Sequence, residues 1–101
     1  MLIYNITFLV SDKVHGPWLK WIRDEHIPFM LESTYISHHQ IARVVTGEKE
    51  DGTSFSVQYH VNDIRTLKQW NQKYSATFQQ DCSEKFGQEV LFFTTVLELI
   101  Q

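Results

Sequence analysis

Two polar residues on otherwise apolar segments are the strongest candidates for chemistry in this sequence. His26 lies on an apolar stripe, between Ile22 and Phe29 and shortly before Pro28. A histidine there would face a cavity between a helix and a sheet, where its near-neutral pKa suits proton transfer. The alternative is a core histidine hydrogen-bonded to a backbone carbonyl that the proline leaves free.

Asn5 is an amide within a mainly apolar segment, and it could hydrogen-bond to a ligand or to bound oxygen. One hypothesis therefore makes Asn5 and His26 the catalytic polar groups of a mostly apolar pocket. Its aromatic, ligand-binding walls would be Trp18, Trp21, Tyr59, Trp70 and Tyr74. The alternative for an aromatic stripe at helical spacing is an ordinary hydrophobic core.

A third set of polar residues depends on the register of a hairpin. If Asp51-Gly52 is a two-residue turn, Arg43 faces His60 across the hairpin, and Gln58 lies on the same face. Arginine and histidine together suit a carboxylate ligand or a dimer interface. The alternative is a solvated sheet margin.

Other reactive residue types lack the spacing that a site needs. His38 and His39 are neighbours on a predicted strand, so they point to opposite faces and cannot share one ion. No three ligands have the spacing of a zinc site, and we expect neither a metal nor a cofactor. The single cysteine, Cys82, lies on an apolar stripe and is expected to be a small core residue. Asp24 and Glu25 diverge on a helix and are expected to be solvated.

Six elements position these residues. Strict alternation predicts strands at 2–10 and 53–61, and β-forming composition predicts strands at 35–46 and 89–100. Three- and four-residue spacing predicts helices at 18–30 and 64–86. Pro28 should end or kink the first near Ile27, whereas Asn62-Asp63 and Gly87 should bound the second. This order predicts a ferredoxin-like βαββαβ fold of the α+β class, an antiparallel sheet with both helices on one face, as one domain over residues 1–101.

Composition excludes several classes of function. The 101 residues carry 9 Lys+Arg against 12 Asp+Glu, a net charge of −3, and thus lack the basic excess of a nucleic-acid binder. No apolar run approaches the ~18 residues of a membrane span. The first residues do not have the pattern of a signal peptide, and one cysteine gives no disulfide framework. We therefore expect a cytoplasmic protein.

The last predicted strand indicates self-association. It is apolar on both faces, with Phe92 and Val96 on one and Phe93 and Leu97 on the other. In a ferredoxin-like order this strand lies at the sheet edge, and one sheet face has no helix over it. A two-fold partner that covers this face would bury the exposed apolar side chains, so we expect a homodimer.

Five short motifs resemble a bacterial family of small proteins known only as a domain of unknown function. They are Tyr4-Asn5-Ile6-Thr7, Trp18 through Trp21 to His26-Ile27-Pro28, Ser56-Val57-Gln58-Tyr59, Phe86-Gly87 and Leu97-Glu98. That family is similar to the dimeric α+β barrel superfamily, which includes antibiotic-biosynthesis-type monooxygenases, haem-degrading enzymes and muconolactone isomerases. The resemblance implies the fold and the dimer, but no reaction. A haem site is not implied, because residues 64–86 hold no histidine to serve as axial ligand.

Two functions of different class fit the sequence. The first is a dimeric module that binds a small, hydrophobic ligand or serves assembly. The second is a cofactor-independent monooxygenase or isomerase acting on a small hydrophobic or aromatic metabolite. The enzyme requires Asn5 and His26 to share an open cavity, whereas the module allows both to be buried and hydrogen-bonded.

Overall fold

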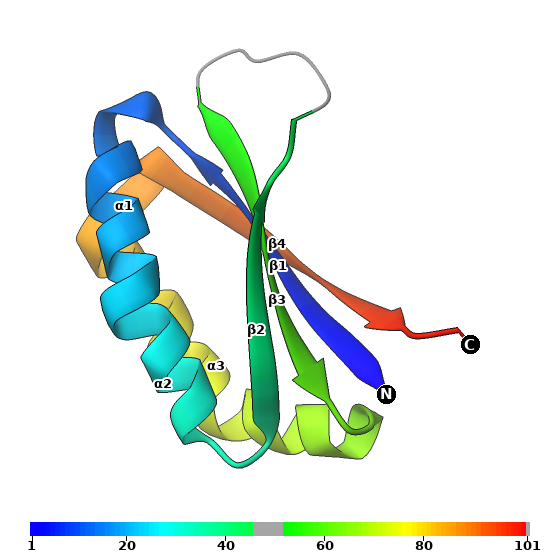
Figure 1. Ribbon diagram of the computed structural model, residues 1–101. Coiled ribbons are helices and arrows are strands. Elements are labelled where there is room, and N and C mark those ends of the chain that lie inside the picture. The colour runs from blue at the N-terminus through cyan, green and yellow to red at the C-terminus, as the bar shows by residue number, and fades with distance from the viewer. Residues whose placement is uncertain (46–51, 101) are drawn as a thin grey trace.

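A computed structural model describes residues 1–45 and 52–100 of the chain. Its strands form one antiparallel sheet in the order β2-β3-β1-β4. Their bounds are β1 Leu2–Val10, β2 Ile36–Arg43, β3 Thr53–Val61 and β4 Val90–Glu98. The described helices all lie on one face of the sheet (Figure 1). The predicted ferredoxin-like α+β order is confirmed, with β4 at a sheet edge.

The first helical stretch contains an irregularity that the sequence did not predict. It runs through four pieces: η1 (Asp12–Val14), α1 (His15–Trp21), the π-helical turn η2 (Ile22–His26) and α2 (Ile27–Glu32). Pro28 was expected to end or kink the helix near Ile27, but the helix continues to Glu32. Instead the backbone widens just before the proline, and the Ile27 N–H donates to the Ile22 carbonyl. Pro28 then occupies the first turn of α2, where its missing N–H costs little.

The second helix has the predicted bounds. The long helix α3 spans Ile64–Phe86, and the Asp63 carboxylate accepts a hydrogen bond from the Thr66 N–H at 2.8 Å at its start. Gly87 ends the helix with a φ of +55°, a left-handed value that glycine adopts without a side-chain clash. A short turn, η3 (Gly87–Glu89), then leads into β4.

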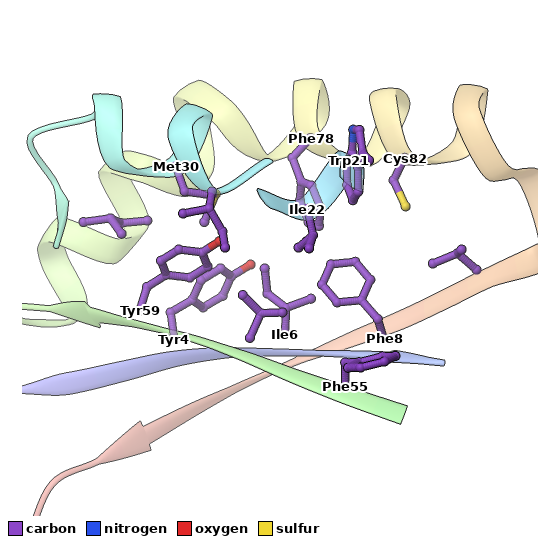
Figure 2. Packing of buried hydrophobic residues seen from close by; sticks show 14 of the residues in the cluster. Tyr4, Ile6, Phe8, Trp21, Ile22, Met30, Phe55, Tyr59, Phe78 and Cys82 are labelled. Atoms are coloured by element: carbon purple, nitrogen blue, oxygen red, sulfur yellow. The ribbon is translucent and has the colours of Figure 1, made fainter. Parts of the chain in front are cut away.

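The hydrophobic core lies between the sheet and the helices. Alternate residues of β1, namely Tyr4, Ile6 and Phe8, point toward the helical layer (Figure 2). There they meet Ile22 and Phe78 from the two helical stretches. The same alternation sends the intervening residues of β1 to the opposite, open face of the sheet.

The open face carries large apolar side chains in the centre and at one edge of the sheet. Leu9, Leu91, Phe93 and Leu97 are 40–62% exposed. Adjacent strands align Leu9 with Leu91, so the residues form one continuous surface. Among the described helices, none has both the length and the apolar composition needed to cross a membrane.

Candidate functional site

His26 lies on the inner side of the helical layer, at the end of the π turn. A π turn inserts one residue into a helix and thereby changes the direction in which the following side chains point. His26 is the last residue of η2, and it is only 2% exposed. Such turns are rare and recur at functional sites, so the surroundings of His26 are the first place to search.

Aromatic rings surround His26. Its imidazole stacks on Trp21 with ring centres 5.1 Å apart, and it lies 4.8 Å from the ring centre of Phe78. Phe8 and Tyr59 present ring edges to it at 5.9 and 6.0 Å. Burial among these rings lowers the pKa of His26 to about 3, because a charged imidazole would lose its hydration there. His26 is therefore neutral at physiological pH.

The Nε2 atom of His26 is buried without a hydrogen-bond partner in the described part of the chain. A neutral imidazole nitrogen in an apolar site loses its bonds to water and gains none in return. Most buried polar groups do have partners. Polar atoms of Trp18, Ser33, Tyr59 and Trp70 are unpartnered too, and His26 is the one of these five residues that lines the cavity described next.

A cavity of about 250 Å³ opens beside His26, between η2 and α3. Exposed Glu25 and Thr77 mark its opening to solvent. Its full lining consists of Trp21, Glu25, His26, Phe29, Thr77, Phe78 and Asp81. The volume is slightly below the ~300 Å³ at which sites for drug-sized ligands begin, so a small molecule would fit.

Two polar contacts join the walls of this cavity. The Trp21 Nε1–H donates to Asp81 Oδ2 at 3.0 Å, and Lys85 Nζ lies 3.5 Å from Glu25 Oε1. Both contacts link the first helical stretch to α3. The cavity thus has aromatic walls, one uncharged imidazole and the two carboxylates of Glu25 and Asp81. Among the described residues, Glu25 is paired with a lysine and Asp81 is not.

Asn5 lies on the opposite face of the sheet from His26. Its amide donates to Thr7 Oγ1 at 3.0 Å and accepts from the Ser56 hydroxyl, and Gln58 donates to Ser56 at 3.4 Å. Asn5 follows Tyr4, which packs on Trp70 of α3, and consecutive strand residues point to opposite faces. The expected cavity shared by Asn5 and His26 is therefore not formed.

Of the predicted aromatic walls, only Trp21 lines the cavity. Trp18, Tyr59 and Trp70 are fully buried in the core, and Tyr74 packs against Phe29 with ring centres 5.8 Å apart. The sequence did not indicate Phe29, Phe78 and Asp81 as lining residues, and Glu25 was expected to be solvated. Phe78 and Asp81 are three residues apart on one helix, and this spacing could have indicated that they lie on the same face.

The predicted hairpin patch has a different register from the one expected. Arg43 pairs with Phe55, Gln58 with Gln40 and His60 with Ser37, so Arg43 does not face His60. The expected register assumed that Asp51-Gly52 forms a two-residue turn. The charged segment Glu48–Asp51 lies outside the described residues, whereas β2 already ends at Arg43 and β3 begins at Thr53. The connection is therefore longer than a two-residue turn.

Cys82 is buried on the inner side of α3, and this burial raises the pKa of its thiol to about 11. A thiol that stays protonated is a poor nucleophile.

Comparison with known protein families identifies the family to which this chain belongs. Residues 1–100 match the family described as a domain of unknown function, DUF4286. The chain belongs to this family. No curated protein matches the sequence. The aromatic cavity described above is thus a feature of a DUF4286 domain for which the family description supplies no activity.

Two solved structures of other proteins have the same fold as this DUF4286 chain. One is an ethyl tert-butyl ether degradation (EthD) family protein from Bacillus halodurans, with a TM-score of 0.70 and 14% identity over 99% of this chain and 100% of the other. Another is a candidate antibiotic biosynthesis monooxygenase from Deinococcus radiodurans, also with a TM-score of 0.70 and 14% identity, over 100% of this chain and 94% of the other. At this identity the likeness shows the fold, a ferredoxin-like α+β arrangement, and not the activity.

Proposed function

We propose that this protein is a homodimeric module that binds a small, largely apolar ligand in the cavity between η2 and α3. The observation that carries the proposal is the Nε2 atom of His26, a buried and unpartnered polar atom on a residue that lines this cavity. A ligand that hydrogen-bonds to Nε2 would remove the cost of leaving that atom unpaired.

The lining defines the chemistry of the ligand. The rings of Trp21, Phe29 and Phe78 favour a flat apolar or aromatic body. Neutral His26 offers one hydrogen bond without a charge. Glu25 and Asp81 place negative charge in the lining, which disfavours an anion. The ligand class is therefore an uncharged or cationic aromatic molecule with one hydrogen-bonding group.

The open sheet face supports the homodimer. Leu9, Leu91, Phe93 and Leu97 form an exposed apolar surface on that face. The solved neighbours share the ferredoxin-like fold, and in the dimeric α+β barrels that the sequence motifs resemble, two such sheets pack together. A second copy on this face would bury the apolar surface together with the polar row of Asn5, Ser56 and Gln58.

Catalysis by His26 has less support than binding. A general base works best when its pKa lies near the operating pH, and an imidazole with a pKa of about 3 is a weak base at pH 7. Asn5, the other polar group of the enzyme hypothesis, lies on the far side of the sheet. The geometry therefore favours the imidazole as a hydrogen-bonding group for a ligand.

The test uses phenol and toluene as matched probes, because they differ by the hydrogen-bonding hydroxyl. Binding is followed through the indole N–H signal of Trp21 in a ¹H–¹⁵N correlation spectrum. We expect phenol to shift this signal, and we expect His26→Phe to weaken phenol binding about tenfold while toluene binding changes little. A His39→Phe variant is the control, since His39 is exposed and is not part of the cavity lining. Equal phenol affinity in the native and His26→Phe proteins, or no movement of the Trp21 signal, would refute the proposal.

A further inference from the structure

A β-bulge in β2 lies opposite His60. Ser37 pairs with His60, and the next paired residue, His39, faces Tyr59. His38 is therefore an extra residue in the strand, and its φ is +49°. In the described residues, it is the only one other than glycine with a positive φ. Histidine tolerates this left-handed conformation better than most residues, but it is still unfavourable.

The bulge brings two imidazoles together. In a bulge, two residues of one strand oppose a single residue of the other, so Ser37 and His38 both oppose His60. The rings of His38 and His60 have centres 5.1 Å apart with an angle of 33° between their planes. A regular strand would have sent His38 to the other face of the sheet. His38 is exposed and His60 half-buried, so solvent reaches the pair.

The separation of the two rings matches that of imidazoles bound to one metal ion. A zinc–nitrogen bond is about 2.0–2.1 Å long, and an imidazole nitrogen lies about 1.1 Å from its ring centre. Two such rings at the tetrahedral angle around one ion would have centres roughly 5.2 Å apart. The observed 5.1 Å is close to this separation.

We propose that His38 and His60 form a binding site for a divalent transition-metal ion of the class that prefers imidazole ligands, Cu²⁺, Ni²⁺ or Zn²⁺. No group of three or more potential ligands occurs in the described part of the chain, so water completes the coordination shell. The site is open and weaker than a four-ligand structural zinc site. It lies at the β2 edge of the sheet, outside the polar row of Asn5, Ser56 and Gln58 and apart from the His26 cavity, and it does not depend on the ligand proposed for that cavity.

The test measures binding of Cu²⁺, Ni²⁺ and Zn²⁺ by calorimetry to the untagged full chain. We expect Cu²⁺ to bind most tightly. His60→Gln and His38→Asn should each weaken Zn²⁺ binding at least tenfold. Asparagine is chosen for position 38 because it also tolerates the left-handed conformation and so preserves the bulge. His39→Gln is the matched control, since it removes an exposed neighbouring histidine that is not part of the pair.

The pattern across the variants decides the outcome. A selective loss in His38→Asn and His60→Gln, with affinity in His39→Gln changed less than twofold, supports the site. Equal weakening in all three variants would mean scattered binding to surface histidines and would overturn it. Unchanged Zn²⁺ affinity in the His38→Asn/His60→Gln double variant would also overturn it, and thermal melting checks that each variant is folded.

Discussion

Lowering the pH from 7 to 5 should destabilise the native protein more than a His26→Phe variant. The folded state holds the pKa of His26 at about 3, below the ordinary value of 6.5 that applies in the unfolded chain. Between these values only the unfolded state binds the proton. The free energy of unfolding therefore falls as the pH drops below 6.5, and the effect is absent above it.

The size of the effect follows from the pKa difference. At pH 5, protonation of an unfolded histidine with a pKa of 6.5 stabilises the unfolded state by about 2 kcal/mol, while folded His26 remains neutral. Glu25 and Asp81, which line the same cavity, are unchanged in both proteins, so their contribution cancels in the comparison. The difference in unfolding free energy between the two proteins should thus change by about 2 kcal/mol, or roughly 8–16 °C in Tm.

The assay is urea unfolding of both proteins at pH 7, 6 and 5, at one protein concentration because a dimer makes stability concentration-dependent. Phenylalanine at position 26 also removes an unpaired buried nitrogen, which shifts the curves by an amount that does not depend on pH. His39→Phe, at an exposed site, is the control and should keep the native pH dependence. If the difference between the native and His26→Phe proteins is the same at pH 7 and pH 5, folded His26 takes up protons, and the assigned burial is refuted.

Substitutions at three further positions test the fold and the dimer. Gly52→Ala should destabilise the chain by about 1–3 kcal/mol, because its φ is +138° and an added Cβ would lie 2.5 Å from the Val10 carbonyl oxygen; an unchanged urea midpoint would contradict this. Asp63→Ala should lower the free energy of unfolding by about 1 kcal/mol, because the hydrogen bond from the Thr66 N–H is lost, whereas Asp63→Asn should keep most of the stability. Equal losses in the two variants would contradict the capping role. Phe93→Glu should convert the dimer to a folded monomer in sedimentation experiments, since it places a charge on the exposed sheet face; a persistent dimer would place the interface elsewhere.

Periodicity in the sequence predicted the regular elements because regular elements bury one face. The alternation of Tyr4, Ile6 and Phe8 predicted the bounds of β1, and the cap at Asp63 and the stop at Gly87 predicted those of α3. The same alternation places Asn5 on the open face. Grouping Asn5 with His26 was therefore inconsistent with the strand pattern that predicted β1.

The candidate sites depend on irregularities that periodicity does not reveal. The π turn at Ile22–His26 has no sequence signal beyond the nearby Pro28. That proline was expected to end or kink the helix near Ile27, not to follow a wider turn. The register of the β2–β3 hairpin depends on the length of its connection, and Asp51-Gly52 was an insufficient guide to that length. The bulge at His38 follows from this register and could not have been found without it.

Both irregularities insert one residue into a regular element next to a histidine of a candidate site. The bulge directs His38 to the open face, whereas the inserted turn ends at His26, which the spacing of the apolar stripe already placed on the inner side of the helix. The aromatic contacts of His26 and the ring contact of His38 share no residue. Their substitutions should therefore be independent.

A double variant tests this independence. The stability change in His26→Phe/His38→Asn should equal the sum of the two single changes within about 0.5 kcal/mol, as for sites without shared partners. His26→Phe should also leave Zn²⁺ affinity unchanged, and His38→Asn should leave phenol affinity unchanged. Urea unfolding and calorimetry on the four proteins give both measurements. A coupling energy above about 1 kcal/mol would contradict this independence. It would mean that the two sites are energetically coupled through β3.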